Sequence, residues 1–232
     1  MNRAVTSLSV AAVAVALGCG REAAPPPASG ATTPSSAPAP SPKTGLAAPG
    51  QRAEIGKPAP DFALVDEAGK PVRLSNHRGK IVVLEWFNPE CPFVDRAHTK
   101  GSLVDAAKRH AASGVVWIAV NSAALGKQGH GAEATWAGKK KFGMAYPVLL
   151  DETGEVGRAY GATNTPHLFV VDAEGRLVYR GAVDNSPDGE GESAPDGKLV
   201  RYVDVALDEL RAGKPVSTPE TKAYGCSVKY AK

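Results

Sequence analysis

The 232-residue chain has few cysteines, few aromatic residues and little excess charge. Its three cysteines, at positions 19, 91 and 226, include no pair spaced as a C-x-x-C motif. The formal net charge of +3 is too small to indicate nucleic acid or an anionic membrane surface as a partner. Aromatic residues make up 6% of the chain and are not interleaved with basic residues, so there is no stacking platform for bases. We therefore expect no nucleic-acid partner.

Long apolar runs are also missing, and the N-terminal one is short. Arg3 precedes the run Ala4–Leu17, which is too short for a permanent membrane span and is typical of a secretion signal. The run leads into Leu17-Gly18-Cys19, which resembles the lipobox of bacterial lipoproteins, although Ala16 stands where that motif usually has Leu, Val or Ile. We expect a signal peptide over residues 1–19, lipid attachment at Cys19 and a membrane-anchored location in the bacterial cell envelope. A plain secreted protein cut nearby is the alternative.

Composition divides the rest of the chain into a tether and one domain. Residues 20–54 are dominated by Ala, Pro, Ser, Thr and Gly, which offer too little apolar side chain to fold, so we expect a disordered tether. Residues 55–232 are enough for one ordinary core, with a C-terminal tail over 214–232. No internal repeat is visible.

Strands and helices alternate along this domain. An N-terminal hairpin is followed by a buried strand, a helix and a second buried strand, and the chain closes with another hairpin and an amphipathic helix. The expected ranges are 62–65 and 72–74, 81–87, 92–112, 115–120, 133–142, 147–150, 155–160, 168–172 and 176–181, and 199–212. This order predicts an α/β fold with a mixed central sheet and helices on both faces.

Cys91 stands where the strand 81–87 gives way to the next helix. Pro92 presets the first helical turn. A thiol at a helix N-terminus lies near unpaired backbone N–H groups and the positive end of the helix dipole, which favours the reactive thiolate. The pattern indicates a reactive thiol; the alternative is a buried cysteine acting as a small apolar side chain.

Three local features resemble the thioredoxin fold. Cys91 matches the first cysteine of the family's C-x-x-C motif, Glu85 its buried acidic residue, and Thr165-Pro166 its cis-proline loop, which lies beside the reactive sulfur in that fold. The N-terminal hairpin and the insertion around 121–132 are more similar to the peroxiredoxin-like redoxins of the alkyl hydroperoxide reductase type. Val94 replaces the second cysteine, and the peroxiredoxin P-x-x-x-T-x-x-C pattern is absent, so peroxidase activity does not carry over.

The resemblance implies a substrate groove beside Cys91. Its expected residues are Pro92, Phe93, Thr165, Pro166 and His167. The alternative for His167 is that it is an ordinary histidine of a strand with no functional role.

We expect different roles for two polar residues that lie near Cys91 in the sequence. Glu85 is expected to accept a proton near the thiol, or else to be paired with a local Lys or Arg. His98 is expected at the surface of the helix.

Cys226 lies beyond the last expected helix, among aromatic and valine residues that suggest a docked tail. Three roles remain open: a resolving thiol for Cys91, a structural staple to it, or a free thiol.

The first functional hypothesis is an envelope thiol–disulfide oxidoreductase or thiol-based antioxidant. Cys91 would attack a protein disulfide or a peroxide, Cys226 would resolve the product, and an external thiol would reset the pair, with neither metal nor other cofactor. The second is a Cu(I)-binding module using Cys91, Cys226 and His167. A non-catalytic scaffold with a stapled tail is the third.

Overall fold

A computed structural model of the chain describes residues 44–46 and 48–232. The expected signal peptide, Cys19 and the tether as far as residue 43 lie outside the described residues. The strands are β1 (Gly45–Leu46), β2 (Phe62–Asp66), β3 (Pro71–Arg73), β4 (Val82–Trp86), β5 (Val116–Asn121), β6 (Val148–Leu150), β7 (Asn164–Thr165), β8 (His167–Val171), β9 (Leu177–Gly181) and β10 (Cys226–Ser227). The helices are α1 (Pro92–Thr99), α2 (Ala106–Ala111), α3 (Gly131–Lys141), α4 (Glu155–Tyr160) and α5 (Tyr202–Arg211), with 3₁₀ turns η1 (Leu74–His77) and η2 (Pro195–Gly197).

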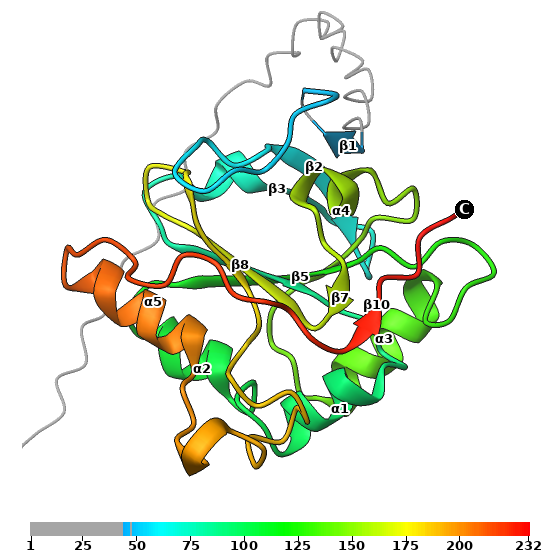
Figure 1. Cartoon of the computed structure of the whole chain (residues 1–232). Helices are drawn as coiled ribbons and strands as arrows, with labels where there is room; N and C mark the ends of the chain where they lie inside the picture. The colour runs from blue at the N-terminus through cyan, green and yellow to red at the C-terminus, as the bar shows by residue number, and fades with distance from the viewer. Residues whose placement is uncertain (1–43, 47) are drawn as a thin grey trace, which may run out of the picture. The chain divides into compact units, whose positions relative to one another are not determined.

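The main sheet is mixed, as expected, and β4 lies near its centre. Its strand order is β1-β2-β6-β5-β4-β8-β9, with β3 paired to β2 (Figure 1). β4 is parallel to β5 and antiparallel to β8. All five residues of β4 are buried because both faces of this strand are covered, which explains why its sequence is apolar apart from Glu85.

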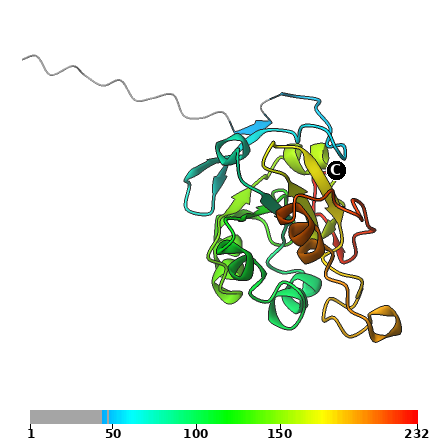
Figure 2. The same ribbon diagram turned by 90° about the vertical axis from the view of Figure 1, so that its left-hand side faces the viewer.

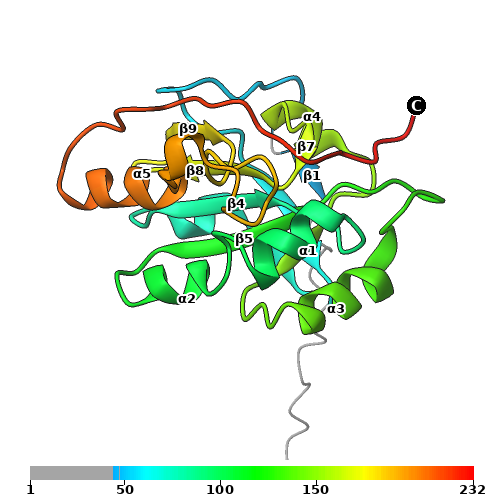
Figure 3. The same ribbon diagram turned by 60° about the horizontal axis from the view of Figure 1, so that its bottom comes forward.

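Helices cover both faces of the sheet. Val156 and Tyr160 of α4 pack with the Trp86 side of β4, whereas Ala106 of α2 and Leu207 of α5 pack with the opposite side. Figure 3 shows α4 above the central strands and α1, α2 and α3 below them. The expected thioredoxin-like arrangement is confirmed. No helix in the described ranges is long and apolar enough to cross a membrane.

The single helix expected over 92–112 is wrong, because the structure has α1 and α2 with a break between them. The loop between β9 and α5, which projects at the lower right of Figure 2, packs against this break. A Cβ on Gly101 would lie 2.2 Å from the carbonyl oxygen of Gly189, and the Ser102 hydroxyl donates to Asp184. Long-range packing therefore interrupts an otherwise helical sequence.

The ordered domain also begins before the boundary expected at Ile55. Leu46 in β1 pairs with Phe62 of β2. Ala53 is buried, and its backbone N–H donates to Ala159 O at 2.9 Å. Composition missed these residues because few of them are apolar: Leu46 and Ala53 reach the core, and backbone pairing holds the segment in place.

Candidate active site

Cys91 is the N-cap residue of α1, and its side chain is 1% exposed. Its backbone N–H donates to Asn88 O at 3.1 Å, which fixes the turn after β4. The thiol packs in an apolar cluster and donates a hydrogen bond to the carbonyl oxygen of Thr165 at 3.1 Å. The other buried members of the cluster are Phe87, Val94, Ala119, Met144 and Val148. Cys91 therefore lies at the expected helix start, but beneath the surface.

The Thr165–Pro166 peptide bond is cis, as the resemblance implied. The C-terminal tail pairs with the strand that precedes this bond. In the antiparallel pair β7–β10, Cys226 lies opposite Thr165 and Ser227 opposite Asn164. The chain's own tail therefore lies where the substrate groove is expected, and its strand β10 runs alongside β7 in Figure 1.

Gly225 allows the tail to approach this closely. Its φ is +106°, a backbone conformation that residues other than glycine rarely adopt. A Cβ at this position would lie 2.3 Å from Thr165 O. Beside it, the ring of Tyr224 contacts that of Phe93 at 6.4 Å between centroids. Tyr224 therefore covers Phe93, and the expected place of Phe93 in a substrate groove stays a prediction.

The tail is held on both sides of Cys226. Before it, Tyr224 Oη donates to Asp184 and Thr221 Oγ1 accepts from the Ala182 N–H. After it, the backbone N–H of Val228 donates to Thr163 O at 3.0 Å, and Tyr230 Oη donates to Ala162 O at 2.9 Å. The docked tail suggested by the sequence is therefore present, and it places Cys226 beside Cys91.

Both thiols of the described domain are free, and Cys91 affects the pKa of Cys226. Burial, then the neighbouring Cys91 thiol, raise the pKa of Cys226 to about 11. Lys229 and the backbone N–H of Phe93 act in the opposite direction. A backbone amide of the first turn of α1 thus acts on the pKa of Cys226, and Cys91 makes no side-chain cap bond. The sequence could not predict this effect, because it depends on where the distant tail lies relative to α1.

Glu85 is fully buried and accepts three hydrogen bonds. His98 Nε2 lies 2.6 Å from Oε1, while Trp117 Nε1 and Tyr146 Oη donate to Oε2 at 3.0 and 3.1 Å. Burial and the Glu85 charge raise the pKa of Tyr146 well above its usual value, which keeps that phenol a donor. Glu85 makes no hydrogen bond to either described cysteine, so its expected role as proton acceptor stays a prediction.

The expected surface position of His98 is wrong, since its side chain is 4% exposed and stacks on Phe142. His98 follows Cys91 by seven residues and Val94 by four, a spacing that places all three on the inner face of α1. This spacing was the sequence signal that could have predicted the burial of His98. Glu85 is therefore paired, but with a histidine rather than the lysine or arginine considered from sequence.

His167 lies apart from the sulfurs. Its Nδ1 accepts a hydrogen bond from the backbone N–H of Thr163 at 3.2 Å, and its ring contacts Phe169 on the side of the sheet that faces α4. Burial, then the nearby Arg180, lower its pKa to about 4. Over residues 44–46 and 48–232 no three His, Cys, Asp or Glu side chains cluster as metal ligands, so the structure does not assemble the copper site of the second hypothesis.

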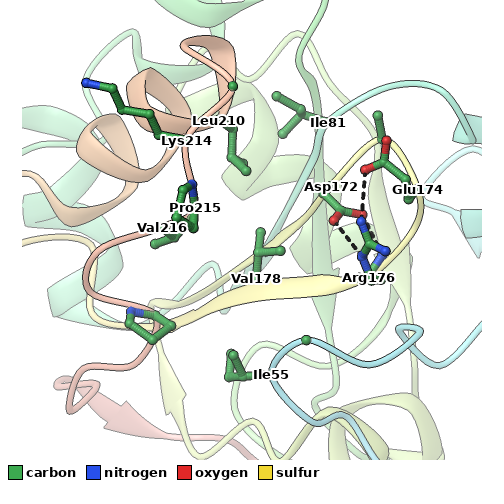
Figure 4. A pocket seen from close by; sticks show the side chains of 14 residues that line it. Ile55, Ile81, Asp172, Glu174, Arg176, Val178, Leu210, Lys214, Pro215 and Val216 are labelled. Carbon is green, nitrogen blue, oxygen red and sulfur yellow. Dashed lines mark hydrogen bonds and ion pairs between the residues drawn. The ribbon is translucent and has the colours of Figure 1, made fainter.

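A cavity of about 650 Å³ lies between β9, α5 and the start of the tail (Figure 4). Ile81, Val178 and Leu210 form part of its apolar wall, and Arg176 pairs with Asp172 and Glu174 at one side. Neither cysteine and none of the expected groove residues lines it. The thiol site is therefore separate from this cavity.

Comparisons with known proteins agree with the geometry. The family model described as Redoxin matches residues 54–214. Thiol-disulfide oxidoreductase ResA of Bacillus thuringiensis subsp. konkukian (strain 97-27) is 28% identical over 138 residues, 55% of this chain and 69% of the relative. Peroxiredoxin-2 of Cricetulus griseus is 32% identical over 145 residues, 54% of this chain and 67% of the relative. The crystal structure of a hypothetical protein from Sinorhizobium meliloti 1021 has a TM-score of 0.67 and 29% identity, covering 82% of this chain and 99% of that one.

Proposed function

Because the chain belongs to the redoxin family and is a thiol-dependent oxidoreductase, we propose that Cys91 and Cys226 form its redox-active pair. The observation that carries this proposal is the shared position of the two thiols at Thr165. Cys91 donates to the Thr165 carbonyl, and Cys226 lies opposite the same residue in the β7–β10 pair. The tail thus supplies the second cysteine that Val94 does not.

In the proposed reaction Cys91 is the nucleophile and Cys226 the resolving thiol. With a peroxide, the Cys91 thiolate attacks one oxygen, the O–O bond breaks, and an alcohol or water leaves. The resulting sulfenic acid condenses with the Cys226 thiol, forming the Cys91–Cys226 disulfide and releasing water. Two electrons pass from the thiol pair to the substrate, and an external thiol reductant returns them.

A protein disulfide is the other substrate of this class. Attack by Cys91 on such a disulfide requires residues around Gly225 to move away, because Cys91 is 1% exposed beneath the tail. A peroxide needs space for only a few atoms. The docked tail therefore supports small substrates for direct attack by Cys91.

Titration with hydrogen peroxide tests the pair. One equivalent should convert the reduced wild type to a monomer with an intramolecular disulfide between Cys91 and Cys226, measured by thiol counting and peptide mass mapping. Cys226→Ser should instead accumulate a Cys91 sulfenate or a dimer linked through Cys91. Cys91→Ser is the matched control and should consume peroxide far more slowly. Persistence of both free thiols in the oxidised wild type would exclude the mechanism.

The reduction potential separates a catalytic pair from a structural staple. We expect a value above roughly −300 mV, since structural disulfides generally lie below that limit. A lower value would favour the scaffold hypothesis.

We also propose that the chain is exported and anchored in the cell envelope through lipid on Cys19. The support is the basic Arg3, the apolar run Ala4–Leu17 and the Gly18-Cys19 junction. An envelope location would also suit a chain that cycles through a disulfide.

A further inference from the structure

In the oxidised form, we propose that external thiols attack the sulfur of Cys226 and that Cys91 is the leaving group. This inference rests on the proposed disulfide and concerns the step that reduces it. It assigns the tail cysteine as the catalytic residue that meets the reductant, whereas Cys91 remains the nucleophile toward the substrate.

Access distinguishes the two sulfurs. Cys226 is partly exposed, whereas Cys91 is 1% exposed and enclosed by Phe87, Val94 and Met144. A thiolate attacks a disulfide in line with the bond that breaks, so it approaches the attacked sulfur from the side opposite the leaving sulfur. The partly exposed Cys226 offers a reductant such an approach from solvent, whereas the apolar cluster packed around Cys91 blocks it.

Leaving-group chemistry favours the same direction. A thiol of lower pKa leaves faster in disulfide exchange, and the pKa of Cys226 is raised to about 11, chiefly by burial. Cys226 is therefore a poor leaving group, which disfavours attack on Cys91. After Cys91 has left and has taken up a proton from solvent, its thiol can again donate to Thr165 O, which is the hydrogen bond of the reduced form.

The surroundings of Cys226 suit an anionic attacking group. The Lys229 ammonium and the Phe93 backbone N–H both favour negative charge near this sulfur. Both would also favour the anionic thiolate of a reductant approaching from solvent.

The step is an ordinary thiol–disulfide exchange. The reductant's thiolate forms a bond to Cys226 Sγ, the Cys226–Cys91 bond breaks, and its electron pair goes to Cys91, which takes up a proton. A second thiolate then attacks the reductant's sulfur in the mixed disulfide and releases Cys226. Two external thiols are oxidised to a disulfide while the protein disulfide is reduced to two thiols.

Trapping the mixed disulfide tests the assignment. Oxidised wild type is mixed with glutathione, quenched with acid within milliseconds to seconds, alkylated and digested. We expect glutathione on Cys226 in at least about tenfold excess over Cys91, a ratio that corresponds to 1.4 kcal/mol in barrier height. Equal labelling, or a majority on Cys91, overturns the proposal.

A second experiment does not require the disulfide to form. The variant Cys91→Ser is prepared with 5-thio-2-nitrobenzoate in a mixed disulfide on Cys226, and Cys226→Ser with the same group on Cys91. Glutathione then releases the chromophore, and the rate of release is measured. Native Cys91→Ser, loaded at Cys226, should react at least about tenfold faster than native Cys226→Ser, loaded at Cys91, and the difference should vanish in urea. Equal native rates would refute the assignment, whereas absence of a wild-type disulfide would refute only the proposed redox pair.

Discussion

Cys226 lies opposite Thr165 in an antiparallel strand pair, and Thr165 accepts the hydrogen bond of the Cys91 thiol. One backbone position therefore holds both sulfurs of a pair separated by 135 positions in sequence. The pairing depends on the tail, so the first prediction concerns its docking.

Gly225→Ala should lift the tail from Cys91. The new Cβ would lie 2.3 Å from Thr165 O at a φ of +106°, so both a clash and backbone strain oppose docking. Native-state alkylation of Cys91 by a bulky maleimide should rise at least about tenfold, the effect of 1.4 kcal/mol on the open population. Gly213→Ala is the control, because Gly213 has a φ of +68° but open space around its Cβ position. Similar acceleration in both variants would contradict a specific contact at Gly225.

The sequence predicted this site only in part, and the reasons are physical. Strand β4, the cysteine at a helix start and the Thr165-Pro166 loop follow from local patterns, and all three are confirmed. The strand register of Cys226, the break at Gly101 and the burial of His98 depend on segments far apart in sequence, which no local pattern encodes.

Glu85→Ala should strongly destabilise the protein. Removing the carboxylate leaves three buried donors, on His98, Trp117 and Tyr146, without their acceptor. We expect a loss of about 3–5 kcal/mol in the free energy of unfolding, measured by urea denaturation. Glu192→Ala, at an exposed position, should change it by less than about 0.5 kcal/mol. A comparably small loss for Glu85→Ala would show that the three donors find other partners.

His167 should make the protein sensitive to acid. Its pKa is about 4 in the folded state and near 6.5 when unfolded, so between these values the unfolded state binds the extra proton. Stability should therefore fall as pH drops from about 6.5 to 4, by on the order of 3 kcal/mol from this group. His167→Gln should lose less stability between pH 7 and pH 4.5 than the wild type, compared by urea unfolding at each pH. Identical losses would mean that His167 is protonated without cost.

Lipid attachment at Cys19 is testable by metabolic labelling. Cells expressing the wild type should incorporate labelled fatty acid into the protein, and Cys19→Ser should not. Cys91→Ser should keep the label, since that side chain is buried in the fold. Equal labelling of wild type and Cys19→Ser would rule out this anchor.

Because the second thiol is carried by a docked segment, its effective concentration near Cys91 is set by the docking equilibrium of that segment. In a C-x-x-C motif a fixed pair of intervening residues sets this quantity, whereas here every contact from Thr221 to Tyr230 contributes to it. A tenfold fall in effective concentration raises a two-electron reduction potential by about 30 mV. Substitutions along the tail should therefore tune the redox poise of the pair in small steps without altering either sulfur.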